Sequence, residues 1–202
     1  MQLAIISESP ADEAALHAFC QTLIGREIAL VEHRLEVRRG WPALKKQLPV
    51  ILRSVRYQTT ATAVLLVVDS DGSDLRPGSP TNRMHELQEI VRRDLSPHSA
   101  GDRRITCLLG LAVPCIEAWW LAHKNPQISE TTWHGRETYP RMPYDKNSLK
   151  RDLYGSEYSP RRREIMISAA REAAGHSDLL HKRFPAGLSP LLAGFAALAE
   201  AD

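Results

Sequence analysis

The hydrophobic positions of the first 125 residues form short continuous runs that alternate with amphipathic stretches. The continuous runs predict strands at residues 3–6, 27–37, 63–68 and 103–113. The amphipathic stretches predict helices at residues 9–25, 41–58 with an interruption near Pro49, 81–95, and from Pro114 onward. Strands that alternate with helices in this way are typical of an α/β fold, with a mainly parallel sheet flanked by helices.

Two of these segments carry especially clear local signals. Residues 63–68, AVLLVV, are apolar without alternation, which predicts a strand covered on both faces, as in a parallel sheet. The helix at residues 9–25 has a good N-cap in Ser9, Pro10 at its first position and Gly25 at its end.

The pattern changes after residue 125, which divides the chain into an α/β core at 1–125 and an extension at 126–202. From His134 to Arg163 there are eight Lys or Arg residues against four Asp or Glu residues, with many turn formers and little apolar periodicity. Four of the five tyrosines of the chain lie in the same window, at Tyr139, Tyr144, Tyr154 and Tyr158. This window predicts a basic loop region, and C-terminal helices at 161–175 and 189–201 are expected to pack on the core.

The overall composition narrows the class of protein. The 202 residues are 43% hydrophobic and 25% charged, which suits a globular domain with a sizeable core and excludes global disorder. The formal net charge of +2 is too small to indicate a nucleic-acid partner, so that question rests on local charge. Apolar runs fall short of the ~20 residues of a membrane span, and the start of the chain lacks a signal-peptide pattern. We therefore expect a cytoplasmic protein without a membrane segment.

Acidic residues follow three of the predicted strands. Glu8 comes after the first strand, Asp69 and Asp71 after the third, and Glu117 in the first turn of the helix after the fourth. In an open parallel sheet, ligands bind outside the carboxyl ends of the strands. Segments far apart in the sequence thus bring candidate catalytic acids to one edge.

The spacing of the two aspartates suggests a metal site. In an extended backbone Asp69 and Asp71 point the same way, and Gly72 lets the chain turn directly afterwards. Two carboxylates, with water and a substrate phosphate completing the shell, suit Mg²⁺ or Mn²⁺, which activates water and neutralises phosphoryl charge. Glu8 is then a third metal ligand or a general acid or base.

Simpler interpretations of each acid remain open. A D-x-D sequence is common in turns, and Glu8 and Glu117 each suit the start of a helix by themselves. Their arrival at one sheet edge favours a shared metal site. An EF-hand is excluded, because the sixth loop position is Asp74 rather than glycine and the twelfth is Pro80 rather than glutamate. Neither G-x-G-x-x-G after the first strand nor a P-loop sequence occurs.

The segments IISES, LLVVDSDG and PCIEAWWLA together resemble the Toprim (topoisomerase–primase) superfamily. More narrowly, they resemble the small stand-alone Toprim-like proteins related to the nuclease domain of OLD-family proteins. The resemblance covers the predicted core and implies a Rossmann-like fold, with Glu8 as the Toprim glutamate, Asp69 and Asp71 as the metal-binding pair and Glu117 as the acid of the E-A-W segment. Ser9 departs from the usual glycine, and the basic residue of some nuclease members has no assignable counterpart.

The resemblance implies a Mg²⁺-dependent nuclease of DNA or RNA, as an effector of a phage-defence or other conflict system. Candidate phosphate-binding residues in the extension are Lys150, Arg151, Arg161, Arg162 and Arg163, and the tyrosines there are candidates for stacking on unpaired bases. The alternative for this region is a solvated basic surface. The alternative function is a non-catalytic or conditionally active subunit that works only with a separate ATPase chain.

Several other residues have structural interpretations. Trp119 and Trp120 continue the apolar side of their helix and are expected to pack in the core. The three cysteines, Cys20, Cys107 and Cys115, lack metal-ligand spacing and are expected to be buried thiols. We expect His85, His123 and His134 to be surface or supporting groups rather than ligands.

Overall fold

The computed structural model describes the chain except for residues 33–39, 74–81, 97–101, 135–141, 156–159 and 202. Its centre is a four-stranded sheet in the order β2-β1-β3-β4, in which every pair is parallel. The strands are β1 (Gln2–Ile6), β2 (Ala29–Leu30), β3 (Ala63–Asp69) and β4 (Thr106–Ala112). The predicted α/β fold with a parallel sheet is confirmed.

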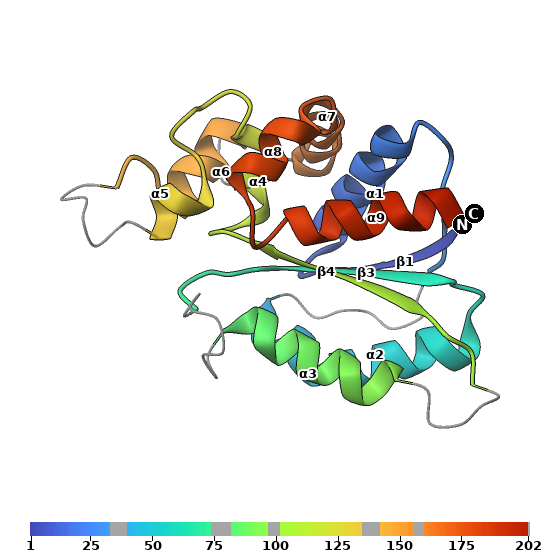
Figure 1. Ribbon diagram of the computed structural model, residues 1–202. Helices are drawn as coiled ribbons and strands as arrows, with labels where there is room; N and C mark the ends of the chain where they lie inside the picture. Colours follow the sequence, from blue (N-terminus) through green and yellow to red (C-terminus); the bar gives the residue numbers. More distant parts are fainter. Residues whose placement is uncertain (33–39, 74–81, 97–101, 135–141, 156–159, 202) are drawn as a thin grey trace.

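Helices cover both faces of this sheet (Figure 1). The helices α2 (Trp41–Gln58) and α3 (Arg83–Leu95) pack together on one face. On the other face lie α1 (Pro10–Ile24) and α9 (Ser189–Ala201), and α9 packs on β4. The remaining helices are α4 (Ile116–Leu121), α5 (Glu130–His134), α6 (Lys146–Tyr154), α7 (Arg162–Ala174) and α8 (Ser177–Arg183).

The extension packs on the core through α7, which contacts both α1 and α4. The helix α6 contacts α4 and α7 in turn. As Figure 1 shows, α4 to α8 gather at the end of the sheet where the strands finish. This places the extension beside the edge at which the acids were predicted to meet.

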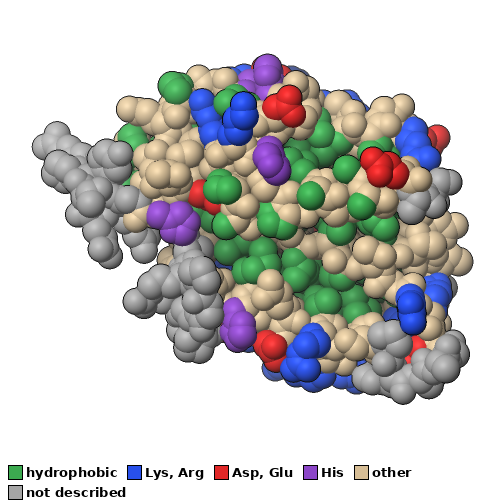
Figure 2. Space-filling view, viewed as in Figure 1, with side chains coloured by type: hydrophobic (Ala, Val, Ile, Leu, Met, Phe, Trp, Pro, Cys, Tyr) green, Lys and Arg blue, Asp and Glu red, His purple; other side chains and the backbone are tan. Residues whose placement is uncertain are grey.

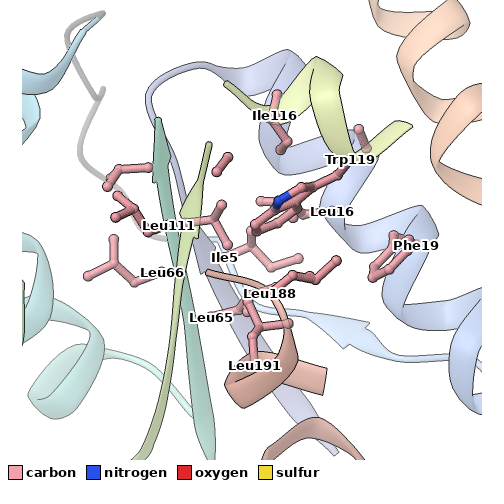
Figure 3. Close-up of a cluster of buried hydrophobic side chains, with 14 of the residues drawn as sticks. Ile5, Leu16, Phe19, Leu65, Leu66, Leu111, Ile116, Trp119, Leu188 and Leu191 are labelled. Atoms are coloured by element: carbon pink, nitrogen blue, oxygen red, sulfur yellow. The ribbon is translucent and has the colours of Figure 1, made fainter. Parts of the chain in front are cut away.

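The hydrophobic core lies between the sheet and its helices (Figure 3). Ile5 and Leu65 come from neighbouring strands, and Trp119 of α4 and Leu191 of α9 lie in the same cluster. All residues of β3 from Ala63 to Val68 are almost fully buried, which explains their apolar run without alternation.

The local signals of α1 act as predicted. The side chain of Ser9 accepts a hydrogen bond from the backbone N–H of Asp12, and Pro10 is the first helical residue. Gly25 ends the helix at a φ of 63°, in the left-handed region that favours glycine.

The interruption expected at Pro49 is wrong, because α2 continues through it from Trp41 to Gln58. Proline costs the helix one backbone hydrogen bond, but Leu48 and Ile51 on either side are fully buried against the sheet. That burial offsets the lost hydrogen bond. Of the strand expected at residues 27–37, the structure gives only β2, and residues 33–37 lie outside the described part.

The loop region expected after residue 125 contains helices that the sequence pattern does not predict, α5 and α6. In α6, Asp145 and Ser148 form a capping box: Ser148 N–H donates to Asp145 Oδ1 at 2.6 Å, and Asp145 N–H donates to Ser148 Oγ at 2.8 Å. Leu149 and Tyr154 then anchor this nine-residue helix by burial. The helix is too short, and too rich in exposed polar residues, for its apolar spacing to stand out. The short helix α8 is a further element that the pattern misses.

Candidate active site

The carboxyl edge of the sheet brings Glu8 and Asp69 together. Asp69 is the last residue of β3, and its backbone N–H donates to Glu8 Oε1 at 3.0 Å. Its own side chain accepts a hydrogen bond from the N–H of Ile116 at 2.9 Å, through Oδ1. Asp69 is thereby tied both to the end of β1 and to the start of α4. The topological expectation that separate segments deliver acids to one edge agrees with this geometry.

Asp71 does not continue the extended backbone that was expected for the pair. Its φ is +46°, in the left-handed region, which aspartate tolerates better than most residues. Its N–H donates to the carbonyl of Pro114 at 3.0 Å, and this bond holds the turn against the loop after β4. The sharp turn runs from Ser70 to Ser73, whose N–H donates to the Ser70 carbonyl at 2.9 Å, so Asp71 and Gly72 are both its central residues and the positive φ falls on Asp71. The two aspartates meet through a shared partner rather than by parallel side chains.

That shared partner is Lys146, the first residue of α6. Its Nζ lies 3.3 Å from Asp69 Oδ2 and also forms an ion pair with Asp71 Oδ1. A second cation, Arg83 at the start of α3, places Nη1 2.6 Å from Asp71 Oδ2 and 3.6 Å from Glu8 Oε1. Both were missed from the sequence, where nothing links a lysine of the extension with an aspartate 77 positions earlier.

Glu117 lies deeper, in α4, with only 1% of its surface exposed. Its Oε1 accepts a hydrogen bond from the hydroxyl of Tyr154 at 2.9 Å and lies 3.4 Å from Nη2 of Arg162. The guanidinium of Arg162 also lies over the Tyr154 ring, 4.9 Å from its centre. Within the described part of the chain, Oε2 of Glu117 has no hydrogen-bond partner.

Asp12 is a further acid near this site that the sequence does not single out. It is 8% exposed, and its Oδ1 finds no hydrogen-bond partner among the described residues. Burial raises the pKa of Asp12 from 3.8 to about 6, and the negative charges of Glu117 and Glu8 add to the shift. In the sequence it appears as an ordinary acid of a helix first turn, a role that hides its burial.

The other acids respond to the same surroundings. Burial raises the pKa of Glu8 and, strongly, that of Asp69, although the charge of Lys146 partly counters the rise at Asp69. Burial acts in the same direction on Asp71, but its hydrogen bonds and ion pairs with Lys146 and Arg83 lower its pKa overall. For Lys146, burial lowers the pKa, but the negative charges of Asp69 and Asp71 raise it by more. The pKa of Lys146 is therefore above its usual value.

The fit of this cluster to a metal ion is mixed. Among the described residues, no group of three or more His, Cys, Asp or Glu side chains is arranged to hold a metal. The charges and ligand types nevertheless suit a divalent cation. Five carboxylates (Glu8, Asp12, Asp69, Asp71 and Glu117) face three cations (Arg83, Lys146 and Arg162), which leaves two negative charges when all are ionised. Two buried carboxylate oxygens, Asp12 Oδ1 and Glu117 Oε2, also lack hydrogen-bond partners among the residues that the structure describes. The residues fit a hard cation, provided that Lys146 moves from between the aspartates.

The basic residues predicted in the extension separate into two groups. Arg151, Arg161 and Arg163 are exposed and Lys150 is half-buried, as a nucleic-acid surface or a solvated surface requires. Arg162 instead turns toward Glu117 and belongs to the acid cluster.

The prediction that the tyrosines stack on unpaired bases is wrong for the two tyrosines that the structure describes. Tyr144 is buried and donates to the carbonyl of Ser129, and Tyr154 is buried against Glu117. Tyr139 and Tyr158 lie outside the described residues.

The structural interpretation is confirmed for both tryptophans and for Cys20 and Cys115, whereas Cys107 is less buried than expected. Trp119 and Trp120 are fully buried. Cys20 and Cys115 are buried and Cys107 is half-buried, and all three are free thiols. Burial raises the pKa of the Cys115 thiol well above its usual value, so it stays protonated beside the acids.

The histidines fall in two places. His85 and His134 are exposed, whereas the side chain of His123 is only 5% exposed and stacks on His176, with ring centres 4.8 Å apart.

No family model, curated protein or solved structure matches this chain in the comparisons made with each. The helices of the described ranges are all too short or too polar to cross a membrane.

Proposed function

We propose that this chain hydrolyses phosphodiester bonds of nucleic acid with Mg²⁺ or Mn²⁺ as its cofactor. The observation that carries the proposal is the meeting of five carboxylates with Lys146, Arg83 and Arg162 at the carboxyl edge of the sheet. Ion pairs of this number at a sheet edge are costly for folding alone, because each buried charge loses its hydration. A cluster with perturbed pKa values in this position supports a catalytic role.

Glu8, Asp69 and Asp71 are the proposed metal ligands. A bound divalent ion would supply Lewis-acid stabilisation of the phosphoryl oxygens and lower the pKa of a coordinated water. Asp69 is held by the N–H of Ile116, and Glu8 by the N–H of Asp69, so two of the three ligands are oriented before any ion arrives.

The cationic residues have a different proposed role. Lys146 stays protonated at neutral pH, since the aspartates raise its pKa, so it serves as a charge for phosphate oxygens and not as a base. Arg83 offers a planar guanidinium to the same oxygens. Asp12, with a pKa of about 6, is suited to exchanging a proton near neutral pH.

The extension is the proposed contact surface for the nucleic-acid backbone. Exposed Arg151 and half-buried Lys150 lie on α6, the same helix that supplies Lys146. Exposed Arg161 and Arg163 flank Arg162 at the start of α7. Phosphates bound along these residues would lead toward the acid cluster, because both helices also contribute a side chain to it.

A second candidate, a conditionally active subunit of a defence system with a separate ATPase, is favoured by one observation. The ammonium of Lys146 lies between Asp69 and Asp71, where a metal would have to bind. In this arrangement Lys146 blocks the proposed metal position. In this proposal a partner chain displaces Lys146 and only then allows metal binding.

The test is cleavage of end-labelled DNA and RNA, single-stranded and duplex, by the purified chain in Mg²⁺, Mn²⁺ or EDTA. We expect metal-dependent cleavage that Asp69→Asn abolishes and that Asp178→Asn, an exposed acid of α8, leaves intact. Cleavage that appears only after an ATPase partner is added would favour the second candidate. Absence of cleavage under both conditions contradicts the nuclease proposal.

A further inference from the structure

A cavity of about 230 Å³ opens beside the acid cluster, at the β4 side of the sheet. Two of its lining residues adjoin residues of the cluster in sequence. Val113 precedes Pro114, whose carbonyl accepts the N–H of Asp71, and Asn82 precedes Arg83, which pairs with the same aspartate. The cavity and the cluster are therefore built from the same two segments and lie side by side.

The lining combines apolar walls with hydrogen-bonding groups. Leu111, Val113 and Met84 supply the apolar part, and exposed Gln88 and His85 of α3 lie at the rim. Figure 2 shows this face of the molecule, where hydrophobic side chains gather in a band between α9 and α3 and histidines lie toward the left end of that band. Of the described lining residues none is Lys or Arg. Such a lining suits a neutral, flat group with polar edges, and not a phosphate.

The far wall of the cavity is fixed by Glu130, which is 2% exposed. Its two carboxylate oxygens accept the N–H groups of Ala186 at 2.8 Å and Gly187 at 2.6 Å. Gly187 in turn accepts the N–H of Leu111 through its carbonyl, at 3.0 Å. A Cβ at position 187 would lie 2.0 Å from the backbone carbonyl oxygen of Leu111 and 2.8 Å from Glu130 Oε1, so only glycine allows this approach. The cavity is thus preformed and does not depend on a ligand for its shape.

We propose that this cavity takes one nucleobase of the strand whose phosphate lies at the acid cluster. The inference rests on the proposed nuclease function and narrows its substrate to strands in which a base is unpaired. The volume is below the roughly 300–1,000 Å³ of pockets that enclose drug-sized ligands, so it suits one ring system. Amide and imidazole groups meet the polar edge of a base, and the apolar walls meet its faces.

Two variants that fill the cavity test the inference through cleavage. Ala186 is exposed and lines the cavity, and its hydrogen bond to Glu130 is made by the backbone N–H, so Ala186→Trp leaves that bond available. Gln88→Trp fills the cavity from α3, and Glu89→Trp, one residue along and outside the lining, is the matched control. We expect wild-type protein to cleave an unpaired strand about tenfold faster than the same strand with an abasic site next to the scissile phosphate. Both filling variants should reduce that ratio to one, and the control should keep it.

A binding measurement separates this inference from the nuclease proposal. In Asp69→Asn protein, titration with single nucleosides should shift the imidazole NMR signals of His85 and His134, and Ala186→Trp should remove the shifts. Nucleoside binding by the Asp69→Asn protein, together with no cleavage by the wild-type protein, supports the cavity inference and contradicts the nuclease proposal. Cleavage that is equal for base-containing and abasic strands overturns the cavity inference and leaves the nuclease standing. Absence of both cleavage and binding overturns both.

Discussion

Lys146 and Asp69 lie 77 positions apart in the sequence, yet Nζ and Oδ2 meet at 3.3 Å at the end of the sheet. The same ammonium pairs with Asp71, so one lysine separates two carboxylates that would otherwise repel each other. The extension thus supplies a charge that the α/β core needs.

Replacing Lys146 with methionine should increase the effect of divalent ions on stability. Without the ammonium, Asp69 and Asp71 face each other, and a bound ion takes over its neutralising role. We expect the rise in Tm on adding Mg²⁺ or Mn²⁺ to be larger in Lys146→Met than in wild-type protein, as measured by calorimetry. Lys150→Met, on the same helix, is the control and should respond as wild type does. An equal response in both variants would speak against a metal site between these aspartates.

Asp12→Asn should stabilise the metal-free protein at neutral pH. Because the folded pKa of about 6 exceeds the unfolded value of 3.8, the folded chain holds this proton more tightly. The contribution of Asp12 to the free energy of unfolding therefore falls as pH rises from about 4 to about 6, by about 2–3 kcal/mol. Denaturant unfolding in EDTA should give Asp12→Asn a higher free energy of unfolding than wild type at pH 7. This difference should shrink as the pH falls toward 4. Glu13→Gln, the next acid of the same helix turn, controls for the lost helix-terminus charge, and a gap independent of pH contradicts the prediction.

Tyr154→Phe should destabilise the protein more than Tyr144→Phe. Both hydroxyls belong to buried rings, but Tyr154 donates to the Glu117 carboxylate and Tyr144 to a neutral carbonyl. Loss of a hydrogen bond to a charged group costs about 1.5–3 kcal/mol, against about 0.5–1.5 kcal/mol for a neutral pair. Urea unfolding of each variant measures its loss of free energy of unfolding, and equal losses would contradict the prediction.

Arg163→Ala and Arg162→Ala should differ in their effect on nucleic-acid binding. Arg163 is exposed, so its removal should weaken binding to every sequence and lower the slope of log affinity against log salt by about one. Arg162 faces Glu117, so its removal should reduce cleavage while leaving the salt slope nearly unchanged. Fluorescence anisotropy across a salt series distinguishes them. Equal slopes for the two variants would show that Arg162 also reaches the phosphates.

Pro49→Ala should raise the free energy of unfolding, since alanine restores a backbone donor inside a continuous helix. The expected gain is about 1–2 kcal/mol, less than the ~3 kcal/mol cost of proline in a helix interior, because the unfolded chain also gains freedom. Urea unfolding provides the measurement. A loss of stability instead would mean that the surrounding side chains have adapted to the proline ring.

The sheet and the acids at its edge could be predicted because both depend on short-range patterns. An apolar run such as 63–68 fits a parallel strand covered on both faces, and parallel strands necessarily end at one edge, which locates Asp69 and Glu117 there. Asp12 was hidden, since its position in a helix first turn gives no sign of burial.

The partners of these acids depend on how distant helices pack. Whether Arg162 or its neighbour Arg163 turns inward is decided by the rotation of α7 against α1, and no local pattern encodes that rotation. The left-handed turn at Asp71 also escapes prediction, because the adjacent Gly72 is the more common residue for such a backbone. Sequence patterns locate the strand ends, whereas tertiary packing selects the groups that face them.

The division of charges along the chain has a consequence for synthesis. All five acids of the cluster lie within the first 117 residues, whereas Lys146 and Arg162 come later. During translation the five acids are synthesised before Lys146 and Arg162. At that stage Arg83 is the only one of the cluster's three cations that is present. Translation therefore completes the electrostatics of the site only once α6 and the start of α7 have been made, and a chain arrested before α6 carries the acids in an unbalanced form.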